Sequence, residues 1–388
     1  MLKIPSQIKW LSWASFASDV SAEMTFPLLP LFMANVLGMT TGQIGLVEGV
    51  GLSTVALLKV FAGYFSDKFR ARKPFIWIGY GIPTITKPIL ALATNWWHVL
   101  IYRFLDRTGK GIRDAPRDAL IAASGAQSVR GRFFGFHRMF DTLGAIVGVV
   151  IATLILLRLP GSYRLVFWLA MIPIAIATLI VYAFVKEKKP VAVHHFSFSL
   201  KRMRWQYKTF LVVAFLFGLA STSYSFLLLQ AQSLGVLVAL IPLIYLVYNL
   251  TYAGFSYPAG VLSDRIGRKK VLLLGYLAFA LVAFGFGSAQ TPVIPWVLMA
   301  LYGFAIALTD GVGAAFVSDL VKPEQRATGI GLYHAVLGIA ILPANVLFGI
   351  VSEAMSAKAA FYLMGMFALA AAVVLFVFVR QKRIKLIR

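Results

Sequence analysis

The chain contains no cysteine and few charged residues, and acidic residues are the scarcest of these. Its 388 residues include 14 Asp and Glu against 37 Lys and Arg, a formal net charge of +23 at pH 7. Without cysteine the chain has no disulfide, no thiolate metal ligand and no cysteine nucleophile. Only 13% of residues are charged, whereas 60% are hydrophobic. This composition is not that of a soluble domain, and it predicts a membrane protein.

Long apolar segments joined by short loops run through the whole chain, which has room for about twelve spans of ~20 residues. Only helices and closed barrels satisfy the backbone in lipid, and apolar segments of this length are helical. We therefore expect an all-α polytopic membrane protein. The predicted helices cover residues 9–34, 42–65, 74–93, 96–122, 133–157, 165–185, 209–230, 236–261, 270–288, 294–319, 329–351 and 359–380.

The positive charge alternates from loop to loop. Basic clusters near 3–9, 68–73, 186–208, 265–270 and 380–388 fall on one side, while the other side has little beyond Arg158, Arg164 and Lys358. The positive-inside bias then places both termini in the cytoplasm and the protein in the cytoplasmic (inner) membrane. A basic surface beside anionic lipid explains the net charge better than nucleic acid does, so no nucleic-acid partner is expected.

One long polar interruption, residues 186–208, joins the sixth and seventh predicted helices. We interpret it as a basic cytoplasmic linker between an N-terminal six-helix bundle at 1–185 and a C-terminal bundle at 209–388. Two short stretches at matching points of these halves are nearly the same: Gly63-Tyr-Phe-Ser-Asp67-Lys-Phe-Arg70-Ala-Arg72-Lys73 and Gly260-Val-Leu-Ser-Asp264-Arg-Ile-Gly267-Arg268-Lys-Lys270. The chain is therefore a duplication. Since Arg70 replaces the glycine of the second copy, we expect a looser turn in the first.

These two loops resemble the signature loop of the major facilitator superfamily of secondary transporters, and shorter stretches such as Asp19-Val-Ser-Ala-Glu23-Met resemble one of its prokaryotic branches. The resemblance implies twelve transmembrane helices in two pseudo-symmetric six-helix bundles, and transport by alternating access. In that family the loop aspartate latches the outward-facing state. The resemblance thus assigns a conformational latch to Asp67, Arg72, Asp264 and Arg268, the alternative being that these residues only fix the loop's shape.

Ionisable groups within predicted spans are costly, so each is a candidate for function. Asp19 and Glu23 share one face of the first helix and have no basic neighbour within a turn. Two like charges repel each other, so one carboxylate tends to keep a proton. The run Arg103-Phe-Leu-Asp106-Arg107-Thr-Gly109-Lys110-Gly111 resembles the family's fourth helix, which makes Arg103 the coupling arginine. The predicted proton-coupling residues are Asp19, Glu23, Arg103, His137 and Asp141.

Bases outnumber acids in the second to fifth helices, which favours an anionic or zwitterionic substrate, while the second half offers aromatic and weakly polar side chains. The predicted substrate cavity comprises Lys59, Lys87, Arg107, Lys110, Arg138, Tyr224, Tyr248, Asn249 and His334. The alternative is a structural salt-bridge network, because Asp106 and Lys110, like His137 and Asp141, have i,i+4 spacing.

The leading hypothesis is a proton-coupled secondary transporter of a small organic solute, not an enzyme and without cofactor or metal centre. Its expected partners are the solute, protons and the lipid bilayer, and we expect a monomer. The alternative is a multidrug-type proton antiporter exporting lipophilic compounds; a divalent-metal transporter or a membrane enzyme is less favoured. Gly144 and Gly148 match part of the antiporters' fifth-helix motif, but Val149 replaces its proline.

Overall fold

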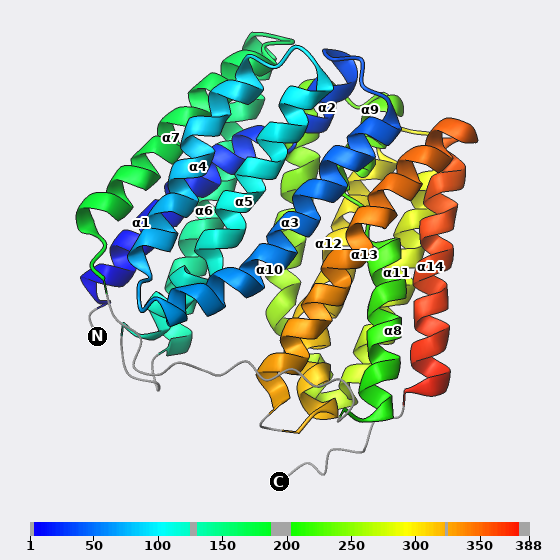
Figure 1. Cartoon of the computed structure of the whole chain (residues 1–388). Helices are drawn as coiled ribbons and strands as arrows, with labels where there is room; N and C mark the ends of the chain where they lie inside the picture. Colours follow the sequence, from blue (N-terminus) through cyan, green and yellow to red (C-terminus); the bar gives the residue numbers. More distant parts are fainter. Residues whose placement is uncertain (1–3, 125–129, 188–202, 323–324, 380–388) are drawn as a thin grey trace. The chain divides into compact units, whose positions relative to one another are not determined.

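The computed structural model describes residues 4–124, 130–187, 203–322 and 325–379. Within these residues the secondary structure is helical, with no β-strand. This confirms the all-α prediction. The α-helices shown in Figure 1 are α1 (Ser6–Thr25), α2 (Leu29–Asn35), α3 (Thr41–Lys68), α4 (Lys73–Ala91), α5 (Trp96–Ala122), α6 (Arg130–Arg158), α7 (Tyr163–Phe184), α8 (Trp205–Ala220), α9 (Tyr224–Ser233), α10 (Ile241–Ile266), α11 (Arg268–Ser288), α12 (Ile294–Leu320), α13 (Arg326–Ala354) and α14 (Ala357–Phe378), with a short 3-10 turn at Val238–Leu240.

Ten of the twelve predicted spans correspond to one α-helix each, and α5 matches the predicted range 96–122 at both ends. The first span is interrupted between α1 and α2, next to Pro27. Proline lacks a backbone N–H, and its ring sterically disfavours the helical conformation of the residue before it. The interruption leaves Phe26 at the end of α1, where its N–H still bonds to the carbonyl oxygen of Ala22 at 2.8 Å.

The interruption between α8 and α9 is not predicted from the sequence, which we interpreted as one helix over 209–230. The backbone leaves the helical path around Ser221–Ser223, and polar side chains satisfy the groups that are released. The backbone N–H of Ser223 donates to Oδ1 of Asn345 at 2.8 Å, and its hydroxyl donates to Oε2 of Glu48 at 3.0 Å. The Ser223 hydroxyl also accepts the N–H of Ser225 at 3.2 Å, so it caps α9.

Among the described residues, nine segments are long and apolar enough to cross a membrane by length and composition. The predicted spans outside this set correspond to α1 with α2, α4 and α5. Each of these contains charged residues, and α5 has the most. The helices that are least suited to contact with lipid therefore carry many of the candidate functional charges, although Lys59 lies on α3 and His137, Arg138 and Asp141 lie on α6.

By their contacts the helices divide into two compact units. Unit 1 comprises Met1–Met39, Val50–His195 and Leu237–Leu243, and unit 2 comprises Thr40–Gly49, Phe196–Val236 and Ile244–Arg388. In unit 1, α1 packs on α6 and α7, and α4 packs on α5 and α7. In unit 2, α11 packs on α12 and α14, and α8 packs on α13 and α14. The two units thus repeat one packing scheme, as a duplicated chain requires.

The turn of the first signature loop is not looser than that of the second, which corrects the expectation from Arg70. Arg70 has φ +52°, in the left-handed region that Gly267 also occupies at +98°. The preceding serines make matching hydrogen bonds, from Ser66 to the carbonyl oxygen of Gly63 (3.0 Å) and from Ser263 to that of Gly260 (2.7 Å). Arginine therefore adopts a conformation that is costly for a residue with a Cβ atom.

We predict that Arg70→Gly stabilises the protein. The left-handed conformation costs arginine about 1–2 kcal/mol, and glycine removes this cost. Glycine also increases the conformational entropy of the unfolded chain, which offsets roughly 0.5–1 kcal/mol of the gain in stability. Thermal unfolding of the purified protein in detergent should show a higher midpoint than that of the wild type. The reciprocal control, Gly267→Ala, should lower the midpoint. An unchanged midpoint for Arg70→Gly would contradict the conclusion that Arg70 is held in a strained conformation.

Candidate functional site

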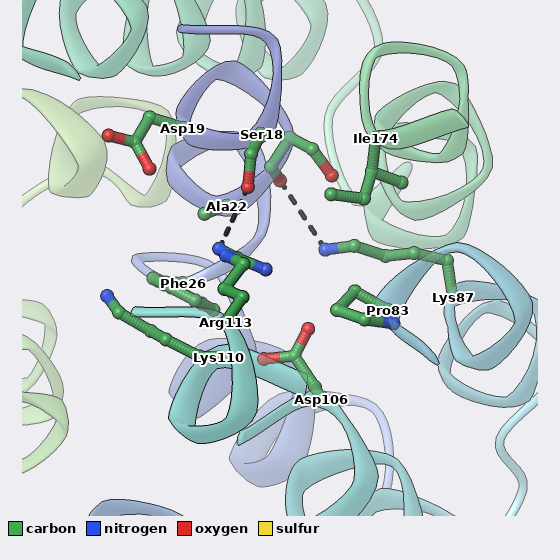
Figure 2. Close-up of a pocket in the computed structure, with 11 residues that line it drawn as sticks. Ser18, Asp19, Ala22, Phe26, Pro83, Lys87, Asp106, Lys110, Arg113 and Ile174 are labelled. Atoms are coloured by element: carbon green, nitrogen blue, oxygen red, sulfur yellow. Dashed lines mark hydrogen bonds between the residues drawn. The ribbon is translucent and has the colours of Figure 1, made fainter. Parts of the chain in front are cut away.

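A small, partly open cavity in unit 1 is lined by charged side chains from three helices. Asp19 comes from α1, Lys87 from α4, and Asp106, Lys110 and Arg113 from α5 (Figure 2). Three cations therefore face two carboxylates. Phe26, Pro83 and Ile174 contribute apolar surface. Three of the predicted site residues, Asp19, Lys87 and Lys110, are brought together here.

One face of α1 presents a stripe of buried hydroxyls, which we name the hydroxyl stripe: Ser12, Ser15, Ser18, Ser21 and Thr25. Residues at spacings of three and four lie along one face of a helix. Arg113 Nη2 donates to Ser18 Oγ at 3.0 Å and its Nη1 donates to the carbonyl oxygen of Gly79 at 3.1 Å. The guanidinium of Arg113 is thereby fixed between α1 and α4.

Lys87 is bound by the same stripe further along α1. Its ammonium donates to Thr25 Oγ1 at 2.7 Å, to the Ser21 carbonyl oxygen at 3.4 Å and to the Tyr102 hydroxyl at 3.3 Å. Figure 2 shows Lys87 and Arg113 both extending toward α1. Lys110 differs, because among the described residues its ammonium has no hydrogen bond or ion pair. Lys110 is therefore the cavity cation that is available to a ligand.

Asp106 and Lys110 do not form the local ion pair that their spacing allowed. The cation near Asp106 is Arg107, whose Nε lies 3.6 Å from Oδ2. The guanidiniums of Arg103 and Arg107 lie over the ring of Phe26, at 5.2 and 4.0 Å from its centre. Such contacts stabilise a cation that has lost water. The interruption after α1 thus supplies the aromatic face on which two buried arginines rest.

Asp19 and Glu23 also pack against α6. A Cβ atom at Gly144 would be 3.2 Å from Cβ of Asp19, and one at Gly148 would be 3.1 Å from Cβ of Glu23. Within the described part of the chain neither carboxylate has a hydrogen bond or an ion pair. The two glycines therefore leave room for two half-buried acids in the seam between α1 and α6.

His137 and Asp141 continue this seam on α6. Nε2 of His137 lies 3.7 Å from Oδ1 of Asp141, and Nδ1 lies 3.3 Å from the Ser12 hydroxyl. Arg138 Nη1 lies 3.7 Å from Oδ2 of Asp141, although the Arg138 side chain is 70% exposed. The local pairing predicted for His137 and Asp141 is confirmed, and the hydroxyl of Ser12 is an additional partner for the histidine.

The remaining predicted cavity residues lie elsewhere. Lys59 is exposed on α3, and it does not line the unit 1 cavity. Tyr224, Tyr248, Asn249 and His334 belong to unit 2. The Tyr224 ring packs on Tyr245 at 4.6 Å, and Tyr248 continues the row, whereas His334 is exposed beside Tyr333.

The latch residues make contacts within their own units. Arg268 Nε lies 2.9 Å from Oδ2 of Asp319, and its Nη2 lies 3.5 Å from Oδ1 of Asp264. Arg72 Nη1 donates to the carbonyl oxygen of Ala119 at 3.1 Å. Both arginines thus reach the last turns of the fourth helix of their half, α5 or α12. The side chain of Asp67 lies outside the described residues.

The sequence analysis missed the hydroxyl stripe and the roles of Phe26 and Arg113. The signal was present, because serines recur every third residue from Ser12 to Ser21. Serine is common in membrane helices as a helix–helix contact, so the spacing alone does not name a partner. In the described residues no group of three His, Asp or Glu side chains is arranged to bind a metal ion.

Comparison with known families gives a consistent result along the chain. The sequence model of the Major Facilitator Superfamily matches residues 11–229 and again 209–387. An uncharacterised MFS-type transporter of Methanocaldococcus jannaschii is 39% identical over 89% of this chain and 88% of its own length. A probable 4-methylmuconolactone transporter of Cupriavidus pinatubonensis is 27% identical over 88% of this chain and 85% of its own.

Two further similarities cover a part of the chain or the fold alone. The multidrug resistance protein MdtH of Photorhabdus laumondii is 31% identical over 34% of this chain and 33% of its own. Among solved structures, a variant of the nucleoside transporter NupG has a TM-score of 0.80 at 17% identity, covering 95% of this chain and 99% of that one. At that identity the likeness concerns the fold.

We predict that Ser18→Ala destabilises the protein. The change leaves one nitrogen of the buried Arg113 guanidinium without its partner, which costs about 1–3 kcal/mol. The midpoint of thermal unfolding in detergent should fall. Ser6→Ala is the matched control, because Ser6 is exposed on the same helix. Equal midpoints for the two variants would refute a structural role for this hydrogen bond.

We also predict that Gly148→Ala disrupts the seam between α1 and α6. The added Cβ would lie 2.5 Å from the backbone oxygen of Val20, so the helices must separate, at a cost of roughly 1–3 kcal/mol. Gly135→Ala on the same helix is the control, because a Cβ there meets nothing within 4 Å. Thermal unfolding should show a lower midpoint for Gly148→Ala alone. An unchanged midpoint for this variant would contradict the close approach of α1 and α6 at residue 148.

Proposed function

The chain belongs to the major facilitator superfamily of transporters, and from this premise we propose that it moves a small organic solute, anionic or zwitterionic, in a process coupled to protons. One observation carries this proposal. The unit 1 cavity presents three cations and two carboxylates, and Lys110 has no hydrogen bond or ion pair among the described residues. A cation in that position gains a partner when an anionic group enters the cavity.

The cations of the cavity have different tasks in this proposal. Arg113 and Lys87 are engaged by the hydroxyl stripe of α1, so they set the local field and the shape of the cavity. Lys110 contacts the solute. Arg107 and Arg103 lie on Phe26 behind Asp106 and keep the field positive where the carboxylate of Asp106 would otherwise dominate.

Asp19 and Glu23 are the proposed proton-binding groups. Their charges interact with each other and with Lys110. When both are ionised they repel each other, so uptake of one proton relieves the repulsion. A carboxylate that has taken up a proton no longer attracts the Lys110 ammonium. The anionic group of a solute can then bind to Lys110 more strongly. Asp141 and His137 lie further along the seam, and we assign them to the same proton pathway.

The proposed setting is a multi-pass protein of the cytoplasmic membrane, with both termini in the cytoplasm, functioning as a monomer in the lipid bilayer. The alternating basic loops support this orientation. The relative that is named for 4-methylmuconolactone supports a small organic solute. The proposal includes a conformational latch formed by Asp67 and Arg72, with Asp264 and Arg268 as its second copy. The contacts of Arg268 with both Asp264 and Asp319 support the second copy.

A second candidate function is proton-driven export of lipophilic compounds. The partial similarity to MdtH favours it, as does the row of tyrosine rings in unit 2. The positive lining of the unit 1 cavity opposes it, because a lipophilic cation is repelled there. Substrate charge therefore separates the two candidates.

We predict that the purified protein in proteoliposomes with an internal pH dye moves protons when a small organic anion or zwitterion is added. Asp19→Asn or Glu23→Gln should abolish transport driven by a pH gradient and leave solute exchange measurable, because only the proton-binding step is lost. Asp118→Asn is a matched control, since Asp118 lies near the end of α5 and does not line the cavity.

Full gradient-driven transport in both the Asp19 and the Glu23 variants would refute the assignment of the proton site. A proton response to lipophilic cations alone would select the multidrug function instead. Loss of transport in Asp118→Asn as well would indicate that any carboxylate change disturbs the fold.

A further inference from the structure

Unit 2 contains a carboxylate inside a membrane-spanning helix that lacks the counter-charges of its counterpart in unit 1. Asp310 lies in α12, ten residues before the last residue, Leu320. It is exposed, and among the described residues no cation lies within ion-pair distance of it. A charge at this depth is costly in lipid, so the exposed carboxylate is a candidate for function.

The duplication provides an internal comparison. Aligning Arg130 with Arg326 gives an offset of 196 residues, which pairs Asp310 with Asp114 of α5. Asp114 lies 4.0 Å from Arg113 Nε and 3.7 Å from Arg117 Nη1, so it takes part in a structural ion-pair network. At the positions of these two arginines, unit 2 has Thr309 and Gly313. The acid is retained in the second half, whereas its neutralising partners are not.

Tyrosine side chains, and not arginines, surround Asp310 in the described part of unit 2. The hydroxyl of Tyr252 donates to Oδ2 of Asp310 at 2.6 Å, a short charge-assisted hydrogen bond that fixes the carboxylate. Tyr248 lies nearly parallel to Tyr252, with the ring centres 6.2 Å apart, and 5.1 Å from the ring of Tyr302. Tyr302 occupies the position that corresponds to Asp106 in unit 1.

A glycine brings these rings onto α12. A Cβ at Gly303 would lie 2.5 Å from the backbone oxygen of Tyr248 and 2.9 Å from the backbone nitrogen of Tyr252. Only glycine permits α10 to approach this closely. In unit 1 the corresponding position is Arg107, which would prevent such an approach. At this position unit 2 therefore combines a close approach of α10 with the absence of the cation that unit 1 has there.

We propose that Asp310 with Tyr248, Tyr252 and Tyr302 forms a binding site for the organic ammonium group of a ligand. The carboxylate supplies the charge, and the electron-rich ring faces attract a cation that has lost part of its water. The inference rests on the proposed function in that the ligand is the transported solute. Of the two solute classes in the proposed function, it selects the zwitterion over the simple anion.

The alternatives fit these residues less well. Ca²⁺ and Mg²⁺ require several oxygen ligands, and one carboxylate beside phenol rings does not provide them. A proton needs no row of aromatic rings. An ammonium group combines one positive charge, hydrogen-bond donors for Asp310 and an apolar substituent that can pack on the tyrosines.

The test is isothermal titration of the purified full-length protein in detergent with two probes of matched shape, phenethylammonium and the neutral 2-phenylethanol. The variants are Asp310→Asn, which removes the charge, and Tyr252→Phe, which keeps the ring and removes the hydroxyl. Tyr257→Phe is the control, because Tyr257 is on the same helix and is 81% exposed.

Wild-type protein should bind phenethylammonium more tightly than 2-phenylethanol. Asp310→Asn should weaken binding of the cation roughly 10- to 100-fold, because the charge that binds the ammonium is lost, and Tyr252→Phe about 2- to 10-fold, because the carboxylate remains but is no longer fixed by the tyrosine hydroxyl. Binding of the neutral probe should not change in either variant. The control should match the wild type with both probes.

Absence of a preference for the cation in wild-type protein would overturn the proposal, and so would equal losses for both probes in Asp310→Asn. If Asp310→Asn does not fold, the test rests on Tyr252→Phe, which must weaken binding of phenethylammonium without changing binding of 2-phenylethanol. Because the titration uses no pH gradient, cation binding without proton flux in proteoliposomes would refute proton coupling and leave the site intact. Proton flux without cation binding would refute the site alone.

Discussion

A lysine or arginine buried in a membrane protein stays charged only if polar atoms replace the water that it has lost. In unit 1 the hydroxyl stripe of α1 provides much of this replacement. It reaches His137 on α6, Arg113 on α5 and Lys87 on α4. One helix thus binds the basic groups of three others, and the arrangement of the bundle depends on these contacts as well as on its apolar core.

The two carboxylates of α1 are held differently from these cations. Asp19 and Glu23 pack against Gly144 and Gly148 of α6, and among the described residues neither of them forms a hydrogen bond or an ion pair. This difference has a functional consequence. In the proposed function the cations held by hydroxyls keep a constant field, while Asp19, Glu23 and Lys110 are the groups whose state changes when a proton or a solute binds.

The two halves show how a duplicated scaffold acquires different chemistry. They retain the turn of the signature loop, with a left-handed residue at Arg70 and at Gly267. Along the fourth helix of each half, however, the residues differ in kind. Arg107 corresponds to Gly303, and this exchange replaces a buried cation on an aromatic ring by a close helix contact that gathers tyrosines around Asp310. The backbone stays similar while the electrostatics reverse.

The sequence alone determined the membrane spans, the duplication, the family and the set of charged residues, because span length, repeat spacing and residue type are local properties of the chain. It also predicted the pairing of His137 with Asp141, which are one turn apart. Only the tertiary structure decided that Arg107 rather than Lys110 lies beside Asp106, that Ser18 and Thr25 bind cations, and that a helix ends near Ser221. Each of these depends on which helices approach each other and on how closely their backbones can pack.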